Sequence, residues 1–278
     1  MKAGFIGTGS MGSILIEAFI QSGVLNPEQI IVGNRTAAKA ERLAEAYPGM
    51  RVAVSNAELV EESDLVFLCI KPSEYKCVID EIKDVAQPGQ IVVSITSPVL
   101  IRHLESQLTC KVMKMIPSIT NYALSGATLM IFGERLSDSD KVMLENMLAH
   151  ISAPIAVTEE YTRICSDLSS VGPAFLSYFV QQFIDAAVEK TGIPRGVATQ
   201  LASEMVLGTG KLLTTGGFDP VSLQKRVTVP GGITEAGLRL MDSELDGMFD
   251  RLVKATHAKY DEDVEKIEAQ FAAAKERA

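Results

Sequence analysis

The first twelve residues of the chain, Met1 to Gly12, are MKAGFIGTGSMG, and they decide the fold of its N-terminal half. An apolar stretch at residues 3–6 runs directly into a G-x-G-x-x-G turn, and a helical pattern at residues 14–20 follows. In a dinucleotide-binding fold, the first glycine permits a tight turn, the second lets the pyrophosphate approach the backbone, and the third lets helix and strand pack closely. The residues expected to bind the pyrophosphate, at a helix N-terminus, are Gly7, Thr8, Gly9, Ser10, Met11 and Gly12. The alternative is a glycine turn that binds no ligand.

The second predicted strand, residues 30–32, ends close to the same turn and is followed by Asn34, Arg35 and Thr36. A fold specific for NAD usually places an acidic residue here, which binds the ribose 2′-hydroxyl and would repel a 2′-phosphate. These three residues instead provide hydrogen-bond donors and a positive charge. We therefore expect NADP(H) to be favoured over NAD(H). The alternative is that Arg35 is only an exposed residue at the start of a helix.

Two further strand ends point to the same cofactor. Ligands of open α/β sheets bind at the carboxyl ends of the strands. The fourth predicted strand leads into Ile70, Lys71 and Pro72, and the fifth into Ile95 and Thr96. We expect these five residues to face the cofactor, although each segment alone has the composition of an ordinary loop.

Strand-like and helical patterns alternate throughout residues 1–158, which predicts a Rossmann-type, doubly wound, mostly parallel sheet. The expected strands are residues 3–6, 30–32, 52–54, 65–70, 91–95, 112–116, 128–132 and 155–157. The expected helices between them include residues 37–47, 73–83, 100–107 and 138–150. Residues 1–158 are therefore predicted to form an NAD(P)-binding domain.

Residues 159–278 show helical periodicity and no strand pattern, which predicts an all-α C-terminal domain for substrate binding and dimerisation. The expected helices are residues 173–190, 195–214, 220–227, 234–241 and 245–275. The first is apolar on most sides, so it must be buried in a core or against another subunit, and we favour a homodimer interface. The charged stretch 261–278 is expected to be a solvated helix end.

Bulk composition excludes several classes of function. The 278 residues carry a net charge of −9, which argues against binding to nucleic acid or to an anionic membrane. A signal peptide and a membrane-spanning stretch are not expected, so the location is predicted to be cytoplasmic. The four cysteines form no C-x-x-C pair and are expected to be reduced and buried, and the three histidines lie far apart. No metal site is therefore expected.

Two glycine-bearing segments stand out in the helical half, at residues 169–174 and 228–234. In the second, Pro230, Gly231 and Gly232 precede a predicted helix, and such a loop presents backbone N–H groups to an anion. The alternative is a plain turn between helices in which Thr234 is the N-cap.

Together these segments resemble the pyrroline-5-carboxylate reductase family over nearly the whole chain. The matching segments are Gly7 to Gly12, Asn34-Arg35-Thr36, Ile70-Lys71-Pro72, Ile116-Pro117, Gly126-Ala127-Thr128, Gly172-Pro173-Ala174 and Pro230-Gly231-Gly232-x-Thr234. The resemblance implies NADPH-dependent reduction of the cyclic imine L-1-pyrroline-5-carboxylate to L-proline, by hydride transfer to its C=N bond. It also implies a homodimer, with a larger oligomer left open.

The resemblance also implies roles for individual residues. Thr234 would hydrogen-bond the imine nitrogen as the catalytic residue, and the backbone N–H groups of Gly231, Gly232 and Ile233 would bind the substrate carboxylate. Asn56 resembles the family's asparagine near the adenosine end of the cofactor.

Three departures from the family pattern fall around the substrate. Val229 stands where the family has serine, Ser170-Val171-Gly172-Pro173 replaces Gly-Ser-Gly-Pro, and Ile116-Pro117-Ser118 replaces Met-Pro-Asn. The segments 95–98 and 116–121 resemble the ComER-like late competence branch of the family, a reductase-like branch encoded with DNA-uptake genes. Two alternatives to pyrroline-5-carboxylate reduction therefore remain: a different small imine or carbonyl acid as substrate, or an NADP(H)-binding protein with a regulatory or assembly role and no turnover.

Overall fold

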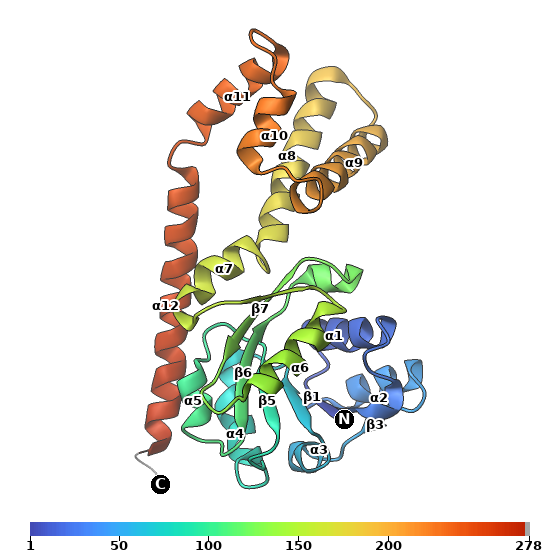
Figure 1. Ribbon diagram of the computed structural model, residues 1–278, viewed down its shortest axis with the longest axis vertical. Coiled ribbons are helices and arrows are strands. Elements are labelled where there is room, and N and C mark those ends of the chain that lie inside the picture. The colour runs from blue at the N-terminus through green and yellow to red at the C-terminus, as the bar shows by residue number, and fades with distance from the viewer. Residues whose placement is uncertain (276–278) are drawn as a thin grey trace. The chain divides into compact units, whose positions relative to one another are not determined.

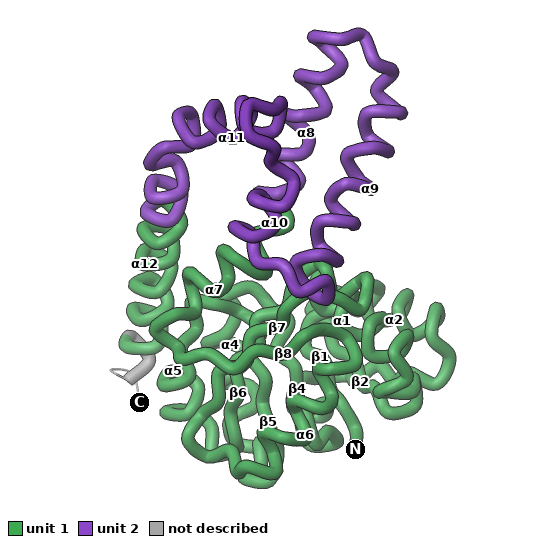
Figure 2. Tube along the Cα trace, turned by 45° about the horizontal axis from the view of Figure 1, so that its top comes forward, with its two compact units in different colours: residues 1–173, 255–278 green, residues 174–254 purple. Residues whose placement is uncertain are grey.

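The computed structural model describes residues 1–275 (Figure 1). The chain divides into two compact units, which Figure 2 shows in different colours. The sheet unit comprises residues 1–173 and the chain from residue 255 onward, and the helical unit comprises residues 174–254. No helix within residues 1–275 combines the length and the apolar composition needed to cross a bilayer. The domain boundary expected after residue 158 stays a prediction.

The sheet unit is built on eight strands in the order β3-β2-β1-β4-β5-β6-β7-β8. Their bounds are β1 Ala3–Ile6, β2 Ile30–Gly33, β3 Arg51–Val52, β4 Leu65–Leu68, β5 Ile91–Ser94, β6 Lys111–Ile116, β7 Ala127–Phe132 and β8 Ala153–Ala156. All neighbouring pairs are parallel except β6 and β7. The predicted doubly wound, mostly parallel sheet is confirmed, and the predicted strand ends differ from the observed ones by at most two residues.

The helices of the sheet unit cover the sheet (Figure 1). Their bounds are α1 Ser10–Gln21, α2 Ala37–Ala46, α3 Asn56–Glu61, α4 Tyr75–Ile82, α5 Ile101–Glu105, α6 Asp138–Ala149 and α7 Thr162–Leu168. Four 3-10 turns join them: η1 Pro27–Gln29, η2 Pro72–Glu74, η3 Ile119–Ala123 and η4 Glu159–Tyr161. The short helices α3 and α7 were not predicted. A cap does precede α3, because the Ser55 hydroxyl accepts a hydrogen bond from the Glu58 N–H at 3.1 Å.

Three phenylalanines fix α1 against the centre of the sheet. Phe5 of β1 stacks on Phe67 of β4 with ring centroids 4.6 Å apart, and Phe19 of α1 lies 5.6 Å from Phe67. All three side chains are fully buried, and aromatic pairs at such distances add to the stabilisation from burial. This packing holds the N-terminus of α1 at the carboxyl end of β1.

The strand order reverses beside β1, which has β2 on one side and β4 on the other. Backbone hydrogen bonds join the three strand ends: the Gly7 N–H donates to Gly33 O at 2.7 Å, and the Cys69 N–H donates to Ile6 O at 2.8 Å. An open α/β sheet binds its ligand at such a switch point.

The helical unit contains α9 Arg195–Thr214, α10 Pro220–Val227 and α11 Ile233–Glu244, together with most of α8 Gly172–Thr191 and the beginning of α12 Met248–Lys275. The predicted helix at 245–275 begins later than expected because Gly247, at φ +64°, forms a turn before α12. The all-helical prediction for this part of the chain is confirmed.

The apolar helix α8 is not buried within this chain. None of its residues is buried, and Leu176, Tyr178, Phe179 and Phe183 are all exposed, Phe183 by 63%. The structure therefore excludes the alternative in which α8 forms an internal core. Its apolar surface requires another partner.

The C-terminal part of α12 belongs to the sheet unit, which corrects the expectation of a solvated end on one face of residues 261–272, while most other side chains of this stretch stay exposed or half-buried. Ile267 is only 2% exposed, and Phe271 stacks on His103 of α5 with ring centroids 5.1 Å apart. The two apolar residues are four positions apart and so share one helix face. Residues 276–278, which the same expectation included, lie outside the described residues.

Candidate functional site

The three glycines of the β1–α1 turn are required for different reasons. Gly7 has φ +103°, and a Cβ atom built on it would lie 2.3 Å from Cys69 O. A Cβ on Gly12 would lie 2.1 Å from Gly7 O, whereas a Cβ on Gly9 would meet nothing within 4 Å. Gly7 and Gly12 are therefore fixed by the packing of the protein itself. The space beside Gly9 is open and available to a ligand.

The N-terminus of α1 offers donors that suit a phosphate group. Gly9 is the N-cap, and no side chain among the described residues caps this end. The Thr8 hydroxyl is buried without a hydrogen-bond partner in the structure. A buried polar atom without a partner calls for a ligand or a water, and helix N-termini bind anions through their free N–H groups. These residues fit a dinucleotide pyrophosphate.

A cavity of about 670 Å³ opens at this edge of the sheet unit. Eight of the residues predicted to bind the cofactor line it: Gly7, Gly9, Asn34, Arg35, Thr36, Asn56, Ile70 and Lys71. The other seven are not among its lining residues: Thr8, Ser10, Met11, Gly12, Pro72, Ile95 and Thr96. Their roles in binding stay predictions.

Sequence reasoning did not identify the wall of the cavity that α4 and η2 form. Its lining residues include Ser73, Glu74, Cys77, Val78 and Glu81. The signal was present in the helical pattern of residues 73–83, because positions 74, 77, 78 and 81 share one helix face. This wall is acidic, whereas Arg35 and Lys39 make the opposite wall basic.

The acidic wall contacts the basic one directly. The Arg35 Nη1 atom lies 2.5 Å from Glu74 Oε1, and the other oxygen of Glu74 accepts from the Lys71 N–H at 3.3 Å. The Arg35 side chain is 86% exposed, and that of Glu74 is 30% exposed. Arg35 is thus accessible to a 2′-phosphate, but a carboxylate already contacts its guanidinium group.

Asn34 joins the two loops that border the cavity. Its Oδ1 atom accepts from the Thr8 N–H at 3.2 Å, and its Nδ2 atom donates to Thr36 O at 2.9 Å. Asn34 therefore orders the β1–α1 turn in addition to lining the cavity.

The part of the cavity predicted to lie near the adenosine of the cofactor contains Asn56 and a cysteine. The Asn56 Nδ2 atom donates to Glu81 Oε2 at 2.6 Å, and the Cys77 thiol donates to Glu81 Oε1 at 3.5 Å. This hydrogen bond, together with desolvation and nearby carboxylates, raises the pKa of the Cys77 thiol. Cys77 is exposed, so the expectation that all four cysteines are buried is wrong for this one. The helical pattern places position 77 on the same face as positions 74, 78 and 81, but it does not show that this face borders a cavity.

A buried lysine fixes the loop after β5. Lys114 of β6 is fully buried, donates to Ser97 O at 3.2 Å and forms an ion pair with Glu159. Burial lowers the pKa of Lys114, and the Glu159 carboxylate partly offsets that effect. Ile95 and Thr96 precede Ser97, so this ion pair positions the segment expected near the cofactor.

The predicted substrate residues lie in the helical unit, at the N-terminus of α11. Gly231 has φ +72°, and the N-cap of α11 is Gly232, with Ile233 and Thr234 as the first helical residues. The alternative in which Thr234 is the N-cap is therefore wrong. Thr234 is half-buried.

The loop before α11 does not leave all of its N–H groups free. The Gly231 N–H donates to the Glu235 carboxylate at 2.5 Å, and the Gly232 N–H donates to Val229 O at 2.9 Å. Two of the three backbone donors expected for a substrate carboxylate thus have partners within the loop and helix.

Among residues 1–275, no group of three or more histidine, cysteine, aspartate or glutamate side chains is arranged to hold a metal ion.

Two family descriptions match the chain. Residues 2–98 match "NADP oxidoreductase coenzyme F420-dependent", and residues 159–263 match "Pyrroline-5-carboxylate reductase dimerisation". The ComE operon protein 4 of Bacillus subtilis (strain 168) is 41% identical over 98% of this chain and 99% of its own length. The pyrroline-5-carboxylate reductase of Methanosarcina acetivorans is 30% identical over 87% of this chain and 89% of its own.

The solved structures agree with this relationship. The pyrroline-5-carboxylate reductase from Coxiella burnetii superimposes with a TM-score of 0.85 at 26% sequence identity, over 94% of this chain and 98% of that one. With matches of this length on both sequence and structure, the chain belongs to the pyrroline-5-carboxylate reductase family.

Proposed function

We propose that this protein is an NADP(H)-dependent reductase of a small cyclic imine, with L-1-pyrroline-5-carboxylate, reduced to L-proline, as the first substrate to test. The observation that carries the proposal is the β1–α1 turn. There the uncapped α1 N-terminus, the open space beside Gly9 and the partnerless Thr8 hydroxyl together fit a pyrophosphate. The basic wall with Arg35 fits the 2′-phosphate that distinguishes NADP(H) from NAD(H).

The chemistry is divided between cofactor and protein. When bound, the reduced nicotinamide supplies the hydride that converts the C=N bond to C–N, and the nitrogen gains a proton. The protein orients the reactants: Asn34 orders the phosphate-binding turn, and Lys114 fixes the loop after β5. Thr234, whose hydroxyl does not serve as the N-cap of α11, is the residue we assign to the imine nitrogen.

We also propose that the protein is a homodimer through α8. Exposed apolar side chains along this helix, such as Leu176 and Phe183, form a surface that a single chain leaves in water. The match of residues 159–263 to a dimerisation domain supports a second copy of the chain as the partner.

The experiment is NADPH oxidation followed at 340 nm with L-1-pyrroline-5-carboxylate, beside a measurement of NADPH binding by calorimetry. Turnover that falls strongly in Thr234→Val, without loss of NADPH binding, would support the proposal. NADPH binding without turnover of this or any related imine would contradict the proposed reduction.

A second candidate function is an NADP(H)-binding protein without turnover. The observation that favours it lies in the loop before α11: the Gly231 N–H, which the family resemblance implies for a substrate carboxylate, already donates to Glu235. The same assay distinguishes the two candidates: intact cofactor binding with no turnover of any imine or carbonyl acid in a substrate panel would support this one.

A further inference from the structure

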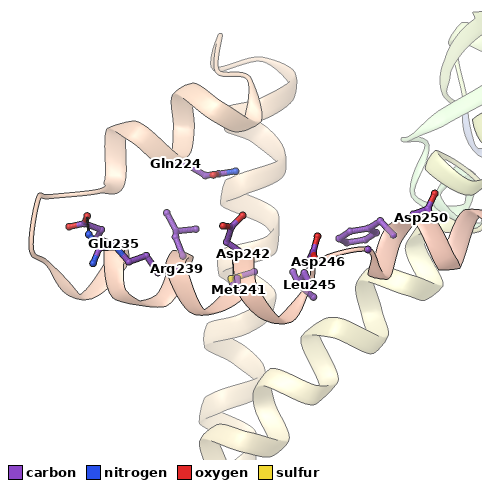
Figure 3. A pocket seen from close by; sticks show the side chains of 11 residues that line it. Gln224, Glu235, Arg239, Met241, Asp242, Leu245, Asp246 and Asp250 are labelled. Carbon is purple, nitrogen blue, oxygen red and sulfur yellow. Dashed lines mark hydrogen bonds and ion pairs between the residues drawn. The ribbon is translucent and has the colours of Figure 1, made fainter.

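A carboxylate of the chain itself occupies the anion-binding end of α11. Glu235 accepts the Gly231 N–H through Oε2 at 2.5 Å, and its other oxygen accepts from Arg239 Nη2 at 2.6 Å. Figure 3 shows Glu235 and Arg239 on α11. Both oxygens are therefore engaged, and the side chain is only 30% exposed.

The contact has a structural benefit of its own. Glu235 lies in the first turn of α11, where a negative charge interacts favourably with the helix N-terminus. The Gly231 N–H is also one of the donors that the family resemblance implies for a substrate carboxylate. Because one N–H group cannot serve two carboxylates equally well, a substrate with a carboxylate must displace Glu235 or bind beside a like charge.

The cavity beside Glu235 is unfavourable for anions as well. It has a volume of about 740 Å³, and its lining includes Asp242, Asp246 and Asp250 along with Glu235, against Arg239 as the one cationic side chain among its described lining residues (Figure 3). Carboxylates at this density repel a further negative charge and attract a cation. The predicted substrate residues 231–234 are not among the residues that line this cavity, so the case for Glu235 rests on its contact with the Gly231 N–H.

We propose that Glu235 is a specificity-determining residue that raises the KM for imines bearing a carboxylate and leaves imines without one unaffected. The inference rests on the proposed imine reduction and deepens it: among small cyclic imines, those without a carboxylate are bound better than those that bear one. Val229 beside the same loop contributes no hydroxyl to an anion, in agreement with this class.

The experiment compares two substrates that differ only in the carboxylate, L-1-pyrroline-5-carboxylate and 1-pyrroline, in the full-length protein with NADPH. Glu235→Gln keeps the shape and removes the charge, so we expect the KM for the carboxylate substrate to fall about tenfold, with kcat and the constants for 1-pyrroline within about twofold. Glu244→Gln, on the same helix but outside the cavity lining, is the matched control and should change neither substrate. A KM for the carboxylate substrate that does not change in Glu235→Gln, or that falls equally for both substrates, would overturn the proposal.

A second measurement separates this inference from the proposed function. If neither imine is reduced by the wild-type protein or by Glu235→Gln, the proposed function fails, and binding of L-proline in the presence of NADP+ decides the role of Glu235. About tenfold tighter L-proline binding by Glu235→Gln than by the wild-type protein, measured by calorimetry, supports the role. Equal binding, or no binding by either, contradicts it.

Discussion

The substitution Glu74→Gln tests whether the acidic wall of the cofactor cavity controls the choice between NADPH and NADH. Glu74 contacts the Arg35 guanidinium at 2.5 Å, where a 2′-phosphate is expected to bind. The phosphate must compete with Glu74 for the Arg35 guanidinium, and the negative charge of Glu74 repels it. Glu74→Gln keeps the shape of the side chain and removes both the ion pair with Arg35 and the repulsion of the phosphate.

The size of the effect follows from the exposure of the pair. Because Arg35 is 86% exposed, the ion pair itself is worth roughly 0.2–1 kcal/mol. A doubly charged phosphate about 5 Å from Glu74 in water adds a repulsion of about 1.5 kcal/mol before salt screening. Their sum, reduced by screening, corresponds to about tenfold tighter NADPH binding by Glu74→Gln. NADH has no 2′-phosphate, so its dissociation constant should stay within about threefold.

The assay is the dissociation constant of each cofactor, measured by calorimetry at fixed low salt and repeated at high salt. Asp80→Asn is the control, because Asp80 also lies on α4 but is not among the residues that line the cavity. An unchanged ratio of NADPH to NADH affinity in Glu74→Gln, or an equal change in Asp80→Asn, would refute the reasoning. Loss of the effect at high salt would agree with its electrostatic origin.

Three further predictions test the turn, the buried lysine and the dimer. Gly9→Ala should keep the thermal stability of the protein but weaken NADPH binding. Gly12→Ala should lower the free energy of unfolding by about 1–3 kcal/mol in urea titrations, because a Cβ at Gly12 clashes with the backbone and one at Gly9 does not. Because burial lowers the pKa of Lys114, the folded protein binds fewer protons than the unfolded chain between that lowered pKa and the ordinary value of 10.5. The free energy of unfolding should therefore rise with pH across this window, and Lys114→Met should reduce the rise in urea titrations from about pH 7 to about pH 10. Phe183→Glu should convert a dimer to a monomer in light scattering, because it places a charge on the apolar face of α8.

The architecture could be predicted from the sequence because its signals are local. The order of strands and helices follows from apolar runs and periodicity, and the glycine turn at Gly7 and Gly12 has a steric cause that any such strand–turn–helix shares. The same reasoning failed for the end of α12. Charged residues are frequent in residues 261–275, and only two large apolar side chains there, Ile267 and Phe271, are described as buried.

Part of the candidate site could not be predicted because it depends on contacts between distant segments. Arg35 and Glu74 are 39 positions apart and meet only when β2 and the segment after β4 reach the same sheet edge. The exposure of Cys77 likewise depends on which face of α4 borders the cavity. The contact of Glu235 with Gly231, by contrast, spans four positions. An acidic residue in the first turn of a helix is a local signal for such a contact, and the sequence contains it.

Each of the two units carries one acidic side chain at a predicted ligand contact. The pyrophosphate end, which is common to all nicotinamide dinucleotides, has uncapped helix N–H groups and open space beside Gly9. The two points at which we propose that ligands are discriminated each carry an acidic side chain, Glu74 on Arg35 and Glu235 on the Gly231 N–H. A carboxylate at such a point lowers affinity for one anion without disturbing the fold, since both contacts lie at the surface. If both substitutions act as predicted, single acidic residues control ligand choice in this chain, while the β1–α1 turn stays the same.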